Sequence, residues 1–171
     1  MKIKFLILFL FIFFNSFSQN ITFVDILSLK DKNKSEVINF LKEYNWEIMH
    51  QHYSKEEKFG DIRFAFDNKS TDRQIPQYIT FYHQNEKKEN NRIQLQVLNK
   101  EKFDKHLTEF KSLDFDYITT IVDANQTKEI YKNNSTTIEV IIMPVNNYFG
   151  KQQTFYTFNI FDNSFNSMIK E

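Results

Sequence analysis

The segment that decides the fold runs from Asn33 to Ile48, Asn-Lys-Ser-Glu-Val-Ile-Asn-Phe-Leu-Lys-Glu-Tyr-Asn-Trp-Glu-Ile, where a helical pattern changes to a strand pattern. Its apolar residues follow the i, i+3, i+4, i+7 spacing of one helix face: Val37, Phe40, Leu41 and Tyr44. Asn33 and Glu36 have the spacing of a capping box. We therefore predict a helix within Asp31–Asn45, whose final asparagine suits a left-handed cap, and a strand that begins at Trp46.

Four runs with strand character follow this helix. They are Trp46–Tyr53, Asp61–Asp67, Gln77–Gln84 and Arg92–Leu98. Alternation of apolar and polar residues is clearest in the second and fourth runs, at Ile62, Phe64 and Phe66 and at Ile93, Leu95 and Val97. A charged, asparagine-rich connection joins the last two runs. The pattern predicts a four-stranded antiparallel meander.

The same order of elements then recurs. A second helical stripe has Phe103, Leu107, Phe110 and Leu113, and the later strand-like runs are Phe115–Val122, Lys128–Tyr131, Thr137–Met143 and Thr154–Phe161. Leu41, Tyr44, Trp46 and Ile48 correspond to Phe110, Leu113, Phe115 and Tyr117 at a constant offset of 69 residues. We interpret the chain as an α+β protein with two α-β-β-β-β pseudo-repeats, about 31–98 and 99–162. We expect one antiparallel sheet, or two abutting sheets, with two helices on one face.

The N-terminus has the pattern of a secretory signal peptide. Two lysines precede the apolar run Phe5–Phe14, and small residues follow it up to Ser18. About 20 residues are needed for a helix that spans a membrane, so this run is short for an anchor, although an uncleaved anchor is the alternative. We expect residues 1–18 to be removed before Gln19, which leaves a single exported domain, 19–171, in the periplasm or outside the cell.

The composition argues against several classes of function. The absence of cysteine removes disulfides, thiolate catalysis, cysteine metal sites and a lipoprotein anchor. After loss of the signal, 20 basic residues face 22 acidic ones, with no basic block for nucleic acid or an anionic membrane. With only 2 glycines there is no phosphate-binding glycine loop or nucleophile elbow. We expect no enzymatic activity and no cofactor.

Histidines are the remaining candidates for metal chemistry. His50 and His52 lie two apart on one predicted strand and so share a face, and His83 lies on another strand. Three imidazoles can hold zinc with an open position, but polar residues at a strand end give the same pattern, so we predict no metal site. His106, beside the predicted core residue Leu107, is assigned to the surface of the second helix.

Alternation divides the strand residues between two faces. The face predicted to contact the helices has Ile48, Ile62, Phe64, Phe66, Ile79, Phe81, Ile93, Leu95, Val97, Val140, Ile142, Phe158 and Ile160. The other face, here called the open face, receives Met49, Tyr53, Arg63, Tyr78, Tyr82, Arg92, Gln94, Gln96, Glu139, Ile141 and Asn159. Tyrosine, methionine and arginine are enriched at protein interfaces, whereas an ordinary half-solvated sheet face is the alternative.

The candidate binding residues are therefore on the open face and on one loop. They are Tyr53, Arg63, Tyr78, Tyr82, Arg92, Gln94, Tyr148 and Phe149. The last two lie in the loop Pro144–Lys151, where exposed aromatic residues either fold back onto the domain or form a protruding contact.

The element order resembles the tandem-repeat architecture of β-lactamase inhibitor proteins, in which two such halves form a concave sheet that grips a periplasmic or secreted enzyme. The resemblance covers nearly the whole mature chain as element order only, and the lack of cysteine departs from a family that uses disulfides. Its asparagine, lysine, isoleucine and phenylalanine usage is also similar to that of small exported proteins of AT-rich bacteria. Fold alone does not transfer a function.

Three functions follow as hypotheses. The first is a non-enzymatic binding module of the cell envelope, of inhibitor or immunity type, that engages a protein through the open face. The second is a carrier of a small apolar ligand in a phenylalanine-lined cavity between sheet and helices. The third is a metal-dependent enzyme built on the histidines.

Overall fold

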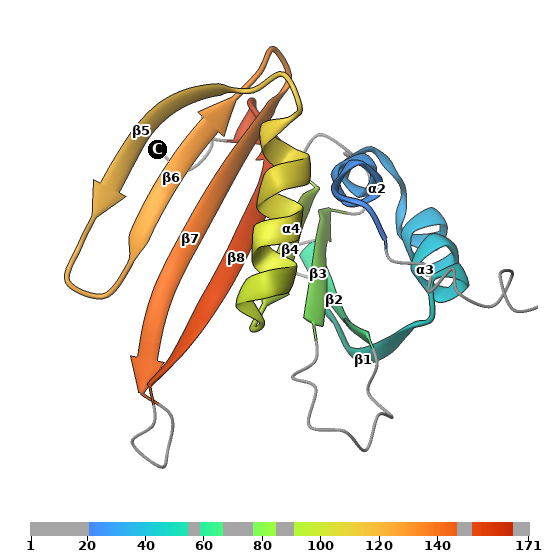
Figure 1. Cartoon of the computed structure of the whole chain (residues 1–171). Coiled ribbons are helices and arrows are strands. Elements are labelled where there is room, and N and C mark those ends of the chain that lie inside the picture. The colour runs from blue at the N-terminus through green and yellow to red at the C-terminus, as the bar shows by residue number, and fades with distance from the viewer. Residues whose placement is uncertain (1–20, 55–58, 67–76, 85–90, 147–151, 166–171) are drawn as a thin grey trace, which may run out of the picture.

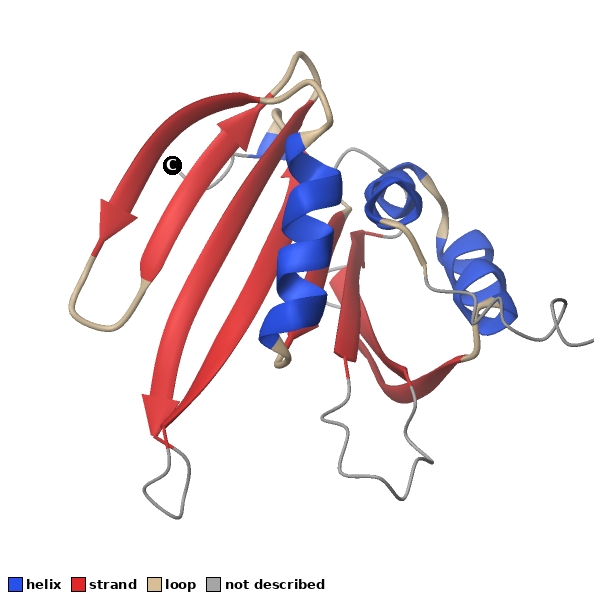
Figure 2. Ribbon diagram, in the orientation of Figure 1, coloured by secondary structure: helices blue, strands red, loops and turns tan. Residues whose placement is uncertain are grey.

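A computed structural model of the chain describes residues 21–54, 59–66, 77–84, 91–146 and 152–165. Within these residues the protein is an α+β fold, with an eight-stranded antiparallel sheet, three α-helices and one 3-10 turn (Figures 1 and 2). The first elements are α2 (Phe23–Ser28), η1 (Leu29–Asp31), α3 (Lys34–Glu43), β1 (Trp46–Ser54), β2 (Phe59–Phe66), β3 (Gln77–Gln84) and β4 (Arg92–Val97). The later ones are α4 (Lys100–Lys111), β5 (Asp116–Val122), β6 (Thr127–Lys132), β7 (Thr136–Asn146) and β8 (Gln152–Asp162).

The strands form one sheet in the order β1-β2-β3-β4-β8-β7-β6-β5. Every neighbouring pair is antiparallel. The pairing of β4 with β8 joins the first four strands to the last four, so the sheet is continuous, and β1 and β5 are its two edges. All eight strands lie where the alternation of the sequence predicts them, with ends that differ by a few residues.

The helix ends are fixed by side-chain caps, as the sequence pattern of α3 predicts. Glu36 N donates to Asn33 Oδ1 at 3.0 Å, and Asn33 N donates to Glu36 Oε2 at 2.7 Å. Asn45 follows the helix with φ 61°, the left-handed conformation that ends it. At α4, Asn99 Oδ1 accepts from Lys102 N at 3.0 Å.

The helix α2 is a correction to the expectation of two helices. It has its own capping box, in which Thr22 and Asp25 exchange side-chain and backbone hydrogen bonds. With 6 residues it is too short to show a helical period in the sequence. Packing fixes it instead, because Phe23 and Ile26 are fully buried.

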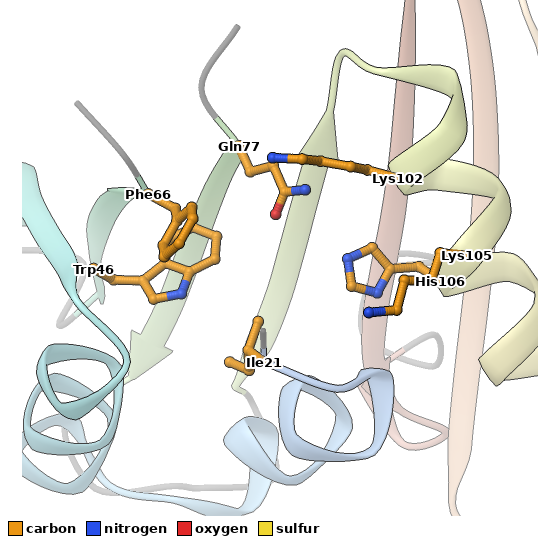
Figure 3. Close-up of a pocket in the computed structure, with 7 residues that line it drawn as sticks. All are labelled: Ile21, Trp46, Phe66, Gln77, Lys102, Lys105 and His106. Atoms are coloured by element: carbon orange, nitrogen blue, oxygen red, sulfur yellow. The ribbon is translucent and has the colours of Figure 1, made fainter. Parts of the chain in front are cut away.

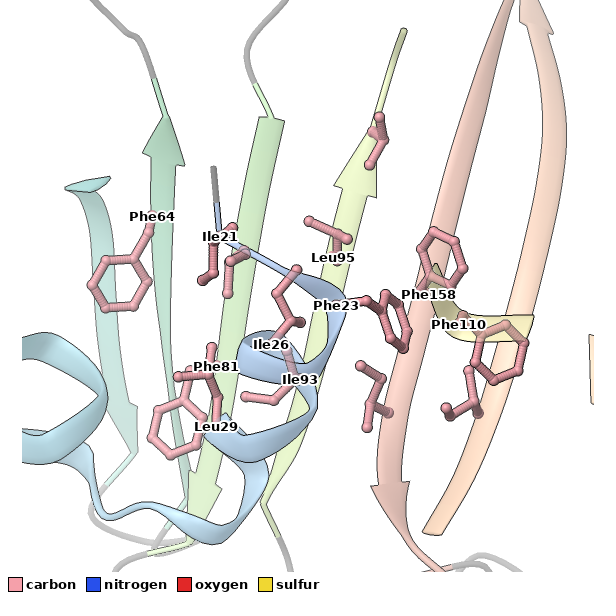
Figure 4. Packing of buried hydrophobic residues seen from close by; sticks show 14 of the residues in the cluster. Ile21, Phe23, Ile26, Leu29, Phe64, Phe81, Ile93, Leu95, Phe110 and Phe158 are labelled. Carbon is pink, nitrogen blue, oxygen red and sulfur yellow. The ribbon is translucent and has the colours of Figure 1, made fainter. Parts of the chain in front are cut away.

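A single hydrophobic cluster joins the helices to alternate residues of the strands. The strands contribute Ile62, Phe64, Ile79, Phe81, Ile93, Leu95, Val97, Ile138, Val140, Phe158 and Ile160. Figure 4 shows Phe23 and Ile26 of α2 packed over Leu95, Phe158 and their neighbours. The ring of Phe158 lies 5.1 Å from that of Phe23 and 5.4 Å from that of Phe103, so one strand residue contacts both α2 and α4.

Two placements in β1 differ from the prediction, that of Tyr53 because of a bulge and that of Ile48 because β1 is an edge strand. Ile48 pairs with Phe64 but His50 pairs with Arg63, so one residue is inserted and the alternation reverses. Tyr53 therefore pairs with Gly60 and lies on the core side of the sheet, where its ring stacks 6.4 Å from that of His83. Ile48 is 39% exposed rather than buried because β1 is an edge strand.

No helix in the described ranges is both long and apolar enough to span a membrane.

Candidate functional site

Five of the predicted binding residues lie together on the open face, on the central strands β2, β3 and β4. Tyr82 pairs with Arg92, and Tyr78 lies four residues earlier on the same strand. Thr80 between them pairs with Arg63 on one side and Gln94 on the other. The pairing register thus gathers side chains that are up to 31 positions apart in the sequence, from Arg63 to Gln94.

Two arginine–tyrosine stacks dominate this patch. The guanidinium carbon of Arg92 lies 4.0 Å from the ring centroid of Tyr82, and that of Arg63 lies 5.7 Å from the centroid of Tyr78. Arg63 Nε also donates to Thr80 Oγ1 at 3.4 Å. A guanidinium over an aromatic face is held by cation–π attraction, so the stacks hold both arginine side chains against the sheet.

Neither guanidinium has a carboxylate partner among the described residues, where every ion pair involves lysine or histidine. Arg92 Nε is buried and has no acceptor in this part of the chain. Because an arginine side chain stays protonated in proteins, the open face carries two fixed positive charges, and neither is in an ion pair among the described residues. Asp61, an acid on the same face, lies 3.8 Å from His52 Nδ1.

A polar network continues the open face across the sheet. Gln94 Nε2 donates to Asn159 Oδ1 at 3.1 Å, and Asn159 Nδ2 donates to Glu139 Oε2 at 3.2 Å. The other carboxylate oxygen of Glu139 accepts from Lys128 Nζ at 3.3 Å. The acid on this side of the face is thus already neutralised and does not pair with the arginines.

One end of the open face is covered by the segment that follows β8. Thr137 and Phe161 pair with each other and are almost fully buried. Thr137 Oγ1 donates to Asn163 Oδ1 at 2.7 Å, and the Phe161 ring lies 5.5 Å from that of Phe165. These residues were not singled out in the sequence, and the only signal was the pair of phenylalanines four residues apart.

The remaining predicted binding residues do not join the patch. Tyr53 lies on the core side of the sheet, as described above. Tyr148 and Phe149 lie outside the described residues. Sequence reasoning also missed exposed apolar residues on the edge strand β5, which are Tyr117, Ile118, Ile121 and Val122.

The three histidines considered for zinc do not converge. His50 and His52 pair with Arg63 and Asp61 on the open face, whereas His83 pairs with Gly60 and is buried on the core side. Burial, with a smaller contribution from nearby Lys34, lowers the pKa of His83. In the described ranges no three histidine or acidic side chains are grouped so that they could hold a metal ion.

His106 is also placed differently from the expectation. It is 5% exposed, with Phe103 and Phe110 on the buried side of α4, while Leu107 is only partly buried. Its pKa is lowered chiefly by burial, and the charge of Glu109 acts in the opposite direction. His106 thus takes the place of Leu107 in the buried stripe of α4, whereas Phe103 and Phe110 are buried as the sequence pattern predicts.

Comparisons with protein-family models, with curated proteins and with solved structures found no match.

Proposed function

We propose that the chain is an exported, non-enzymatic protein-binding module whose open face binds an acidic surface of a partner protein, in the periplasm or outside the cell. The observation that supports this proposal is the pair of stacked guanidinium groups, Arg63 and Arg92, that lack an acid partner in the described residues. Charged groups of this kind attract a surface of opposite charge and fix its orientation.

The spacing of the two stacks suits a protein rather than a small ligand. Tyr78 and Tyr82 are four residues apart on one strand, which corresponds to about 13 Å at roughly 3.3 Å per residue. Tyrosine and arginine are also the residues that most often dominate binding energy at interfaces. An inhibitor or immunity protein that covers the acidic site of an enzyme is one form of this function.

We also propose that the two halves are pseudo-repeats, with the helices on one face and the open face left for the partner. The strand order is the same read from either edge toward the central β4–β8 pair. The bulges fall between Ile48 and His50 in β1 and between Tyr117 and Thr119 in β5, which keeps the offset of 69 residues seen in the sequence. Leu41 and Phe110, at the same offset, are both buried.

Affinity capture from an extract of exported proteins tests the function. The bait is the chain from Gln19, and the variant is the triple alanine substitution of Tyr78, Tyr82 and Arg92. A matched control carries alanine at three exposed positions of α4, Glu101, Asp104 and Thr108.

We expect the unmodified chain and the α4 control to capture the same acidic protein and the open-face variant to lose it. Capture should weaken as salt rises from about 50 to about 300 mM, because salt screens exposed charges. Equal capture by the open-face variant, with its circular dichroism unchanged, would sink the proposal.

A further inference from the structure

A cavity of about 80 Å³ lies between α4 and one end of the first three strands, on the core side of the sheet and so opposite the open face (Figure 3). Its lining comes from five separate parts of the chain: Ile21, Trp46, Phe66, Gln77, Lys102, Lys105 and His106. Lys105 is 55% exposed, so the cavity reaches solvent on the side of α4.

The two sides of the cavity differ in chemistry. Ile21, Phe66 and the indole of Trp46 form an apolar wall. Across from it, α4 presents Lys102, Lys105 and His106, and Figure 3 shows their side chains directed toward that wall. Lys102 Nζ lies 6.0 Å from the centroid of the Phe66 ring, so it reaches most of the way across.

Trp46 supplies the most informative atom. The residue is 2% exposed, and its Nε1 is buried with no hydrogen-bond partner in the described part of the chain. An indole N–H is a donor only, and buried donors in native proteins are nearly always paired, with protein, water or ligand. In Figure 3 this nitrogen is on the side of the indole that borders the cavity.

His106 is the second buried group without a full set of partners. Its Nδ1 has no hydrogen bond in the described residues and lies 3.7 Å from Glu109 Oε2. That oxygen already accepts from Phe23 N at 2.8 Å. Because burial lowers the pKa of His106, the positive charge at the cavity comes from the two lysines.

The lining therefore offers donors and positive charge, and no carboxylate is among its residues. Lys105 Nζ lies 4.0 Å from Glu109 Oε1, whereas Lys102 is in no ion pair among the described residues. Trp46, Lys102 and Lys105 can only donate, and Gln77 is the one side chain with a carbonyl oxygen. We propose that this cavity binds the carboxylate of a short-chain monocarboxylic acid, with the charged end toward the lysines and the alkyl end against Trp46 and Phe66.

The volume sets the size of the ligand. Liquid water takes about 30 Å³ per molecule and an engineered cavity of about 150 Å³ holds benzene, so about 80 Å³ accommodates about three non-hydrogen atoms. Because the cavity reaches solvent beside Lys105, the carboxylate of a small acid such as acetate or propionate can extend toward the lysines at the opening. This cavity has one phenylalanine in its lining and is amphipathic, so it differs from the apolar, phenylalanine-lined cavity expected of a carrier.

The chain contains 1 tryptophan, and this residue lines the cavity, so its signals report on the site directly. The experiment is a titration of the chain from Gln19 with sodium propionate, followed by the indole Nε1–H resonance in ¹H–¹⁵N spectra and by tryptophan fluorescence. Sodium chloride and propylammonium chloride at equal ionic strength are the reference titrations.

We expect a saturable downfield shift of the indole resonance with propionate alone, with a dissociation constant of order 1 mM for so small a ligand. The double variant Lys102→Met and Lys105→Met should weaken binding by about tenfold or more, since charge-assisted hydrogen bonds are lost. Lys100→Met and Lys111→Met, on the same helix but outside the lining, should leave binding unchanged.

Three outcomes would overturn the proposal. One is no saturable shift with propionate, which means that the cavity holds water only. Another is the same shift with chloride, which means a non-specific salt effect. The last is unchanged propionate affinity in the Lys102→Met and Lys105→Met variant with its fold intact. Because the open face is not involved, failure of this experiment leaves the proposed protein-binding function standing.

Discussion

Replacement of Phe23 by alanine tests whether α2, which the sequence pattern did not reveal, belongs to the core. Phe23 is 0% exposed, and its ring lies 5.5 Å from Phe110 and 5.1 Å from Phe158. Removal of a fully buried phenylalanine costs about 3–5 kcal/mol, through lost burial and the cavity left behind. A domain of this size is stable by about 5–15 kcal/mol, so the loss is a large share of the total.

Equilibrium urea unfolding, followed by circular dichroism and tryptophan fluorescence, measures this effect. With a slope of about 2 kcal/mol per molar urea, the midpoint should fall by about 2 M with the slope unchanged. Val24→Ala is the matched control, because its side chain is 55% exposed on the same helix, and it should change stability by less than about 0.5 kcal/mol. A Phe23→Ala protein within about 1 kcal/mol of the unmodified chain would refute the packing argument.

Three further predictions concern local features of the fold. Gly60→Ala should destabilise by about 1–3 kcal/mol in urea unfolding, because an added Cβ would lie 2.8 Å from His52 O and 2.9 Å from the His83 ring, and an unchanged midpoint would contradict this contact. Asn33→Ala should lower the free energy of unfolding by about 1 kcal/mol through loss of the α3 cap. Ser35→Ala is the control, and a smaller loss of stability for Asn33→Ala than for Ser35→Ala would argue against the cap. The free energy of unfolding should fall as the pH drops below 6.5. Burial lowers the folded-state pKa of His106, so below this pH the unfolded chain binds a proton more readily than the folded chain does. The free energy of unfolding of the His106→Gln variant should therefore depend less on pH.

Elements whose signals are local were predicted well from the sequence. The α3 helix has its stripe and both caps within Asn33–Asn45, so its start and its left-handed end follow from neighbouring residues. The strands show alternation along their own length, which does not depend on the partner strand. The order of the strands across the whole sheet could not be predicted from these local patterns, because the pairing of β4 with β8 joins residues about 65 positions apart.

The errors arise where distant residues decide the outcome. The bulge in β1 moves Tyr53 to the core side, and nothing in the strand sequence marks the extra residue. His106 is buried because α2 packs on that side of α4, which no helical period can show. The cavity near Trp46 needs five separate segments together, so it is visible only in three dimensions. The arginine–tyrosine stacks were anticipated as residues on a shared face, but not as pairs.

Site-specific photo-cross-linking is the most direct test of the open face as the binding surface. A photoreactive phenylalanine analogue at Tyr78 places the cross-linker on the open face, and the same analogue at Glu101 places it on the exposed side of α4. In an extract of exported proteins we predict one acidic partner cross-linked from position 78 and none from position 101, with the product lost when Arg92 is replaced by alanine. Cross-linking of a partner from position 101, or no product from position 78, would contradict the account.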